Sequence, residues 1–283
     1  MARCAKFFVE NGEFLKAVKL YVVGGQYEKA IALCSTHHLT ITDELAEELS
    51  PPKVMSSKQQ RNKIQGQRTM ACQDERTEIL LKLARVCNEQ NSFQLACKKF
   101  TQAGDRTLAL KCLLRSGDTK NIIYYASVSR QRDIYILAAN YLQSLDWQTG
   151  SDGAAELTKK IVEFYTKARA NESLASFYDA YAQMEIDEFR DYEKALGALK
   201  ESRLQLIKAP KMIDKERRIA ALDSRITIVS EFVEIRRFEK MDPPRMVEMC
   251  TSFLQTRDVE SVLDCAKLII FLFFYYSDSF VDD

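Results

Sequence analysis

The chain has 283 residues, of which 46% are hydrophobic and 29% are charged, with 41 basic and 40 acidic side chains. This composition is typical of a folded protein and excludes an intrinsically disordered one. The near balance of charge produces no long-range field to attract nucleic acid or an anionic membrane, so we expect neither as a partner. Only nine glycines and five prolines interrupt a sequence rich in good helix formers, which predicts an all-α fold.

The two ends of the chain lack the features of a targeting segment. Residues 1–12 carry charges on both sides of a short apolar patch, whereas a secretory signal has a continuous apolar core. The longest apolar run, residues 268–276, is far shorter than the roughly 20 residues that cross a bilayer. We therefore expect a soluble intracellular protein without a transmembrane segment, and we expect the terminal run to favour self-association.

Eight cysteines are spread along the chain, and no two of them form a Cys-x-x-Cys pair. His37 and His38 are the only histidines that could complete a zinc site. The even count would permit disulfides, but most of the cysteines lie on apolar helix faces at positions suited to a small side chain. We interpret them as reduced, mostly buried thiols. They are Cys4, Cys34, Cys72, Cys87, Cys97, Cys112, Cys250 and Cys265.

The residues from 2 to 36 predict the first helices of the chain, and one pattern begins there and then recurs. It consists of a turn, an aromatic residue, two further residues, an alanine, three more residues and a large apolar side chain. The clearest copies are Gly12–Tyr21, Gly25–Cys34 and Ser92–Phe100, and weaker copies are Gly104–Leu113 and Asp191–Leu199.

The spacing of this pattern has a helical cause. Positions 0, 3 and 7 of a helix share one face, so the aromatic, the alanine and the large residue point the same way. The alanine allows a neighbouring helix to approach closely, and a glycine ahead of several copies ends the previous helix. The pattern predicts a right-handed α-solenoid of tetratricopeptide-like antiparallel helix pairs, with a non-repeating helical bundle as the alternative. The alanines expected to be buried are Ala17, Ala30, Ala96, Ala109 and Ala195.

Composition divides the chain into five segments. We predict first helical repeats at 1–50, a basic mobile loop at 51–73, central helical repeats at 74–147, C-terminal helical repeats at 154–267 and an atypical apolar tail at 268–283. A short helix is expected at 42–50, with Thr42 as its N-cap and Pro51-Pro52 at its end. Helices should resume near Asp74 and continue to about Leu142, and a break follows at Trp147–Gly153.

The segment 51–73 has five basic residues and no acidic one, and a phosphate- or membrane-binding arm is the alternative to a loop. A mobile loop is favoured because interleaved aromatics and amphipathic spacing are missing. The basic residues are Lys53, Lys58, Arg61, Lys63 and Arg68.

Beyond the second break, helices are expected at about 154–167, 170–183, 187–208 and 212–238. The last helix carries an apolar stripe that spans about two heptads, which is too short to argue for a coiled coil. We predict that the last two helices form a long hairpin packed against the solenoid. The stripe consists of Ile219, Leu222, Ile226, Val229 and Val233.

The sequence contains none of the common nucleotide-binding, zinc-hydrolase or nucleophile-elbow motifs. His37 and His38 follow a short helix in a polar stretch, so we interpret them as a surface helix end rather than a catalytic base. We therefore assign no catalytic, cofactor-binding or metal-binding residue, expect no cofactor, and leave the partner-binding residues unassigned.

A group of aromatic residues is the most distinctive feature of the central repeats. Tyrosine and tryptophan are enriched at protein contact sites but also build helix-pair cores. We expect most of them in the core, with one or two left to face a partner. They are Tyr124, Tyr125, Tyr135, Tyr141 and Trp147.

Several stretches resemble the tetratricopeptide part of one family, that of the 140-kDa subunit of intraflagellar transport complex A. The longest is Ser116–Trp147, and shorter stretches are Lys99–Gly104, Phe164–Lys167, Phe177–Ala180, Ala2–Ala5 and Glu185–Glu188. The resemblance extends over roughly residues 1 to 267. It implies a non-enzymatic scaffold of retrograde ciliary transport and cilium assembly, located in the cytoplasm, the cilium and the ciliary base. Its implied partners are the other complex A subunits and adaptors for ciliary membrane cargo.

The chain departs from this family in three places. The family has β-propellers ahead of its helical repeats, which this sequence lacks, so we expect a C-terminal fragment or a partial gene product. The segments 51–73 and 268–283 do not match the family pattern, and we expect the second to be foreign to it. A vesicle-coat or coatomer-like solenoid is the alternative scaffold, and an enzyme is a more distant one.

Overall fold

The computed structural model describes residues 2–52, 63–145, 153–210, 213–238 and 241–255. Trp147 and the predicted tail at 268–283 lie outside these residues. The described residues contain helices and no strand, so the all-α prediction is confirmed. The chain divides into a first unit, residues 1–169, and a second unit, residues 170–283. The boundary falls inside the segment predicted as the C-terminal repeats.

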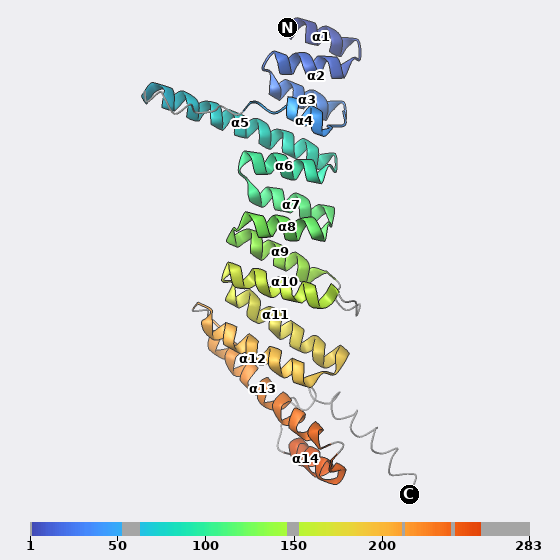
Figure 1. Ribbon diagram of the computed structural model, residues 1–283, viewed down its shortest axis with the longest axis vertical. Coiled ribbons are helices and arrows are strands. Elements are labelled where there is room, and N and C mark those ends of the chain that lie inside the picture. The colour runs from blue at the N-terminus through green and yellow to red at the C-terminus, as the bar shows by residue number, and fades with distance from the viewer. Residues whose placement is uncertain (1, 53–62, 146–152, 211–212, 239–240, 256–283) are drawn as a thin grey trace. The chain divides into compact units, whose positions relative to one another are not determined.

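The first unit is a stack of helices that pack in chain order (Figure 1). Only two or three residues connect most neighbouring helices, and helices joined by such short turns run antiparallel. The short α4 is an addition between α3 and α5, which contact one another directly. The helices are α1 (Ala2–Glu10), α2 (Phe14–Val23), α3 (Tyr27–Thr36), α4 (Asp43–Glu48), α5 (Lys63–Glu89), α6 (Phe93–Ala103), α7 (Arg106–Ser116), α8 (Thr119–Ser129), α9 (Arg132–Ser144) and α10 (Gly153–Ala168).

The second unit contains longer helices. Neighbours again pack in chain order, which makes both units solenoids of the predicted class. The predicted hairpin of two long helices is present as α12 and α13, and α12 also packs on α11. The elements are α11 (Asn171–Met184), a π-helical turn (Glu185–Phe189), α12 (Tyr192–Lys208), α13 (Lys215–Arg237) and α14 (Pro243–Gln255).

The alanines of the repeat lie at the helix contacts as predicted. Ala17, Ala30, Ala96, Ala109 and Ala195 all have no exposed surface. Four of the large residues at the far end of the pattern are also buried: Cys34, Phe100, Leu113 and Leu199. On α13, Leu222, Val229 and Val233 are buried, while Ile219 and Ile226 pack against the same core from its edge. The face-sharing argument is therefore confirmed in both units.

The tight turns of both units share one backbone feature. The residue two positions before the next helix adopts a left-handed conformation, with φ between 50° and 91°. Glycine occupies this position before α2, α3, α7 and α8, as the role of glycine as a helix stop predicts. Asparagine or arginine occupies it elsewhere, at Asn91, Arg130, Arg169 and Arg190. The sequence did not predict these four positions.

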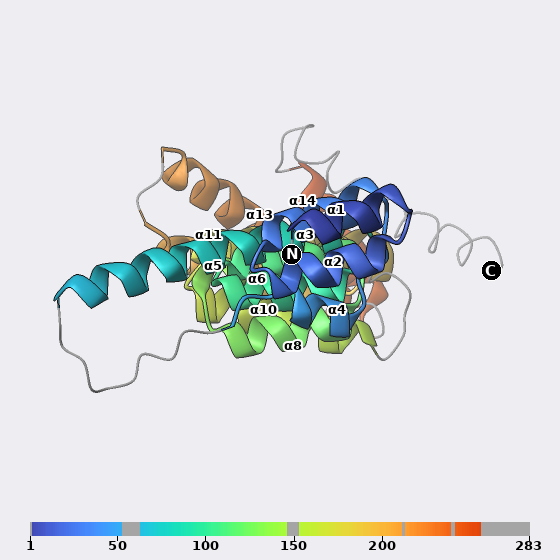
Figure 2. The ribbon, with the colours of Figure 1, turned by 90° about the horizontal axis from the view of Figure 1, so that it is seen from above.

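Two predicted boundaries are wrong. The helix α5 begins at Lys63 rather than near Asp74, so the loop prediction fails for residues 63–73, and residues 53–62 lie outside the described part. The N-terminal half of α5 extends away from its neighbouring helices in two views (Figures 1 and 2). The helix predicted from 187 begins at Tyr192, because residues 185–189 complete the previous helix in π geometry and Arg190 then reverses the chain.

Candidate protein-interaction surface

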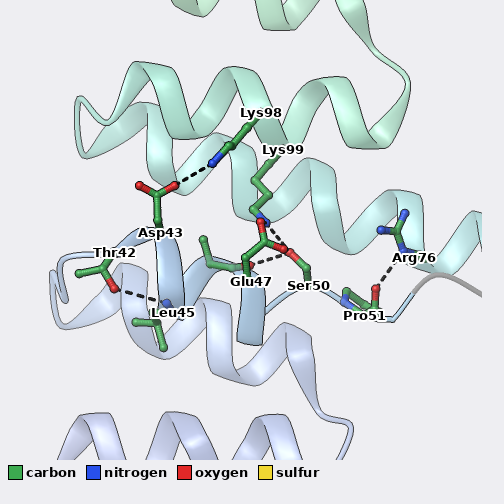
Figure 3. Close-up of polar contacts among 10 residues, drawn as sticks. Thr42, Asp43, Leu45, Glu47, Ser50, Pro51, Arg76, Lys98 and Lys99 are labelled. Atoms are coloured by element: carbon green, nitrogen blue, oxygen red, sulfur yellow. Dashed lines mark hydrogen bonds and ion pairs between the residues drawn. The ribbon is translucent and has the colours of Figure 1, made fainter.

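The short helix α4 is held on the first unit by a buried lysine of α6 (Figure 3). The side chain of Lys99 has no exposed surface, and its Nζ donates hydrogen bonds to Glu47 Oε1 and Ser50 Oγ, each at 2.9 Å. The Glu47 side chain is 60% exposed, so the ion pair lies at the edge of the core. The hydrogen bond from Lys99 is the main reason that the pKa of the Glu47 carboxyl is lowered.

Four further polar contacts tie the residues around α4 to the helical stack. Gln90 accepts a hydrogen bond from Ile41 N at 3.0 Å and donates one to Leu39 O at 2.7 Å. Arg76 Nε donates to Pro51 O at 2.9 Å, and Lys98 pairs with Asp43 at 3.2 Å (Figure 3). The α4 segment is therefore a fixed part of the first unit rather than a loose loop.

The N-terminus of α4 confirms one prediction. Thr42 has an extended backbone, and its side-chain oxygen accepts a hydrogen bond from Leu45 N at 3.3 Å, as an N-cap does (Figure 3). Lys99 itself was not singled out from the sequence. The sequence feature that marks it is a charged residue three positions after Ala96, on a helix face that is otherwise apolar. Such a position indicates a buried cation with a partner.

Of the four described tyrosines in this group, one is buried, two are partly buried and one is exposed, so fewer lie in the core than expected. Tyr135 is 7% exposed and packs against Phe164, with their ring centroids 5.5 Å apart. Tyr125 is half-buried, and its hydroxyl lies 3.0 Å from Thr101 Oγ1. Tyr141 is also half-buried, whereas Tyr124 is 69% exposed.

The exposed tyrosine belongs to an apolar patch on α8. Val128, one helical turn after Tyr124, is 61% exposed and shares its face. Two large apolar side chains on one exposed helix face favour a protein contact, because their burial would remove apolar area from water. We call Tyr124 and Val128 the α8 patch.

The predicted buried thiols are confirmed at four positions. Cys34, Cys87, Cys97 and Cys112 are buried and free, and Cys250 is partly buried, while Cys4 is exposed. Burial raises the pKa of the Cys34 and Cys97 thiols to about 11 and that of Cys87 to about 12. These thiols stay protonated near neutral pH and fill space as small apolar groups. Cys72 and Cys265 lie outside the residues whose side chains are described.

His37 and His38 lie at the surface end of α3, as predicted. His37 follows the last residue of the helix, and its ring stacks on Phe14 with centroids 3.8 Å apart. His38 adopts a left-handed conformation with φ 50° in the turn that follows. Among the described side chains, no three His, Cys, Asp or Glu residues converge as a metal site would require. In the same part of the chain, no helix is long and apolar enough to span a membrane.

Comparison with protein-family models identifies the family to which the repeat belongs. Residues 1–164 match the model of the TPR domain shared by intraflagellar transport proteins 140 and 172. The chain belongs to this family. A second model, the C-terminal TPR domain of intraflagellar transport protein 140, matches residues 172–279. Both models include protein 140, which confirms the resemblance to the 140-kDa subunit. The gap between the two matches contains the boundary between the first and second units.

The comparison corrects one expectation about the end of the chain. The match to the C-terminal TPR domain of protein 140 continues to residue 279, beyond residue 267 where the resemblance was expected to stop. Most of the segment 268–283 therefore belongs to the region that the family model matches, and the expectation that it is foreign to that family is wrong.

Proposed function

We propose that this chain is a non-enzymatic scaffold of intraflagellar transport complex A, supporting retrograde ciliary transport and cilium assembly through protein–protein contacts. The observation that carries the proposal is the order of the two family matches along one chain. The TPR domain shared by intraflagellar transport proteins 140 and 172 comes first, and the C-terminal TPR domain of protein 140 follows. The buried contacts of both units support it, because they make a stack of helices that presents its outer faces to partners.

The partners that fit this proposal are other subunits of complex A and adaptors for ciliary membrane cargo. The place of action is then the cytoplasm, the ciliary base and the cilium. Within the first unit, the α8 patch is the surface that we assign to such a partner, since its two apolar side chains are exposed on one helix face.

Affinity purification of the tagged chain from ciliated cells, followed by mass spectrometry, tests this function. The expected result is recovery of complex A subunits, and recovery of vesicle-coat proteins in their place would support the coatomer-like alternative. A variant with Tyr124→Glu and Val128→Glu should recover less of at least one subunit, because a carboxylate on each position opposes apolar burial.

Val23→Glu is a matched control for the α8 patch. Val23 is 68% exposed, at the end of α2. Equal losses in the control and in the α8 variant would contradict the assignment of the patch while leaving the scaffold proposal intact.

A further inference from the structure

The second unit contains an irregular turn that does not follow the repeat. The helix α11 ends at Met184, and Glu185–Phe189 continue it as a π-helix. The turn closes when Asp191 N donates a hydrogen bond to Glu185 O at 3.0 Å. Single π-helical turns are often found at functional sites, because the extra residue redirects the side chains that follow it.

A buried carboxylate anchors this turn. Glu185 is 4% exposed, and the Tyr181 hydroxyl is hydrogen-bonded to its carboxylate. Burial and then this hydrogen bond raise the pKa of Tyr181. With Glu185 fixed in the core, the other end of the turn leaves Phe189 at the surface, where half of its side chain is exposed.

Phe189 forms one edge of an open pocket of about 500 Å³. This volume lies within the range of pockets that bind small ligands or one or two side chains. Its apolar lining residues are Phe189, Tyr192 and Val233, of which Phe189 is the most exposed, and we call them its apolar wall. Its basic lining residues are Arg190, Arg236 and Arg237, which come from the turn and from the end of α13.

One arginine of the pocket is oriented by other contacts. The Arg236 guanidinium lies 5.3 Å from the centroid of the Tyr192 ring, and its Nη1 donates to Arg190 O at 3.3 Å. Arg237 is exposed in the last turn of α13. A guanidinium that is already oriented loses less side-chain entropy when it binds a carboxylate.

The carboxylates of the pocket do not cancel this positive charge. Three arginines line it against two acidic residues, Asp191 and Glu193. Asp191 is already used, because it accepts a hydrogen bond from Lys194 N at 3.0 Å as the N-cap of α12 and pairs with Lys194 Nζ at 2.9 Å. These contacts lower the pKa of Asp191 and keep it ionised.

We propose that this pocket binds an acidic peptide segment of a partner protein that carries an apolar anchor residue. The carboxylates pair with Arg236 and Arg237, and the anchor packs against Phe189 and Val233. Charge complementarity and the apolar wall together favour this partner, since a free phosphate would leave the apolar wall unused. The inference rests on the proposed function only in treating the chain as a protein-binding scaffold.

Fluorescence anisotropy with the purified full chain tests the proposal. The probe is a short labelled peptide in which glutamates alternate with phenylalanine and leucine, and its counterpart has lysine in place of each glutamate. The glutamate peptide should bind, more weakly as the salt concentration rises, and the lysine peptide should not. Arg237→Glu should weaken binding about tenfold or more, because a charge-assisted hydrogen bond is replaced by repulsion.

Arg217→Glu is the matched control, since Arg217 is exposed on the same helix, 20 residues before Arg237. It should leave binding unchanged. Phe189→Ser should also weaken binding, because it removes the apolar wall at a residue that is half exposed and therefore not needed for folding.

Four results would overturn the proposal. They are absence of glutamate-peptide binding, equal binding of both peptides, equal losses with Arg217→Glu and Arg237→Glu, and binding that appears only after deletion of residues 277–283. The last result would assign the pocket to the chain's own acidic end. Because the chain and the peptide are both purified, the result of this binding experiment does not depend on whether the chain co-purifies with complex A.

Discussion

The two units are built from the same kind of helix contact but differ in how they support it. Apart from α5 and α10, the helices of the first unit have 6 to 13 residues, and each makes its contact through a short apolar face. In the second unit, α12 and α13 have 17 and 23 residues and pack together along an apolar contact of several turns.

In the second unit, α13 also makes a row of polar contacts with α11. Arg218 and Arg225 of α13 lie seven residues apart and reach α11, where they contact Glu172 and Ser176, and Asp179 and Gln183, respectively. The first unit instead relies on isolated anchors such as Lys99. The comparison indicates that a short helix is held in position by single residues. A long helix is held by contacts that repeat at helical spacing along its length.

The largest effect should come from the apolar contact between α12 and α13 in the second unit. Phe232 is 3% exposed, and its ring centroid lies 4.7 Å from that of Tyr192. Phe232→Ala should lower the free energy of unfolding by about 3–5 kcal/mol, because it leaves a cavity between α12 and α13. Chemical denaturation measures this loss. Phe189→Ala, at an exposed position, is the control and should change stability by less than about 0.5 kcal/mol.

The single anchor of the first unit should respond asymmetrically. Glu47→Ala leaves the buried Lys99 ammonium without its carboxylate and should cost about 2–3 kcal/mol. Lys99→Met keeps a similar side-chain volume and leaves only the exposed Glu47 carboxylate without its partner, so it should cost less than about 1.5 kcal/mol. Equal losses for the two variants would show that Lys99 does not depend on Glu47. Lys98→Met, in an exposed ion pair, should cost less than about 0.5 kcal/mol.

The alanine contact points should not tolerate larger side chains. Ala96→Leu places extra volume where α6 has no free space and should cost about 1–3 kcal/mol, measured as a lower thermal midpoint. Gln94→Leu, on the exposed face of the same helix, should have little effect. An unchanged midpoint for Ala96→Leu would contradict the face-sharing argument at this repeat.

At the left-handed turn positions, removing a glycine should lower stability and introducing one should raise it. Gly104 has φ 91° and no atom within 4 Å of an added Cβ, so Gly104→Ala should cost about 1 kcal/mol from backbone strain alone. Arg130→Gly relieves that strain at φ 50° and should stabilise the first unit by up to about 1 kcal/mol. Loss of stability in the second variant would show that the Arg130 side chain outweighs its strain.

The smallest effect should be a pH dependence of the Lys99 anchor. Lys99 lowers the pKa of Glu47 in the folded chain, so the pair stabilises the fold fully above the ordinary glutamate pKa. That contribution is lost as the pH falls through the lower, folded-state pKa. Glu47→Gln should therefore lose less stability than the parent between neutral and acidic pH, as followed by circular dichroism.

The sequence predicted the features that depend on local pattern. The buried alanines, the Thr42 N-cap and the α13 stripe each follow from a spacing or a residue type within a few positions. The start of α5 at Lys63 does not follow from amphipathic spacing, which residues 63–73 lack, but agrees with their helix propensity. Lysine, glutamine and arginine in that segment are in fact good helix formers.

The other features that the sequence did not predict depend on residues that are distant from one another in the chain. Lys99 meets Glu47 across 52 positions, and Arg236 meets Arg190 across 46. The left-handed conformation of Arg130, Arg169 and Arg190 is imposed by the helices on both sides of each turn, since arginine has no intrinsic preference for it. Such positions become visible only when the packing of the helices is known.

The uniform turns have a consequence for changes in chain length. Each residue added within a helix rotates the residues after it by about 100° about the helix axis. One residue inserted in α7 ahead of Ala109 would thus carry Ala109 off its contact face, and the two-residue turns that flank α7 leave little slack to compensate. The segment around α4 is constrained in another way, because its own polar contacts tie it to the stack and Glu47 and Ser50 hold the buried Lys99. Deletions should therefore be rejected in α4 as well as at the tight turns.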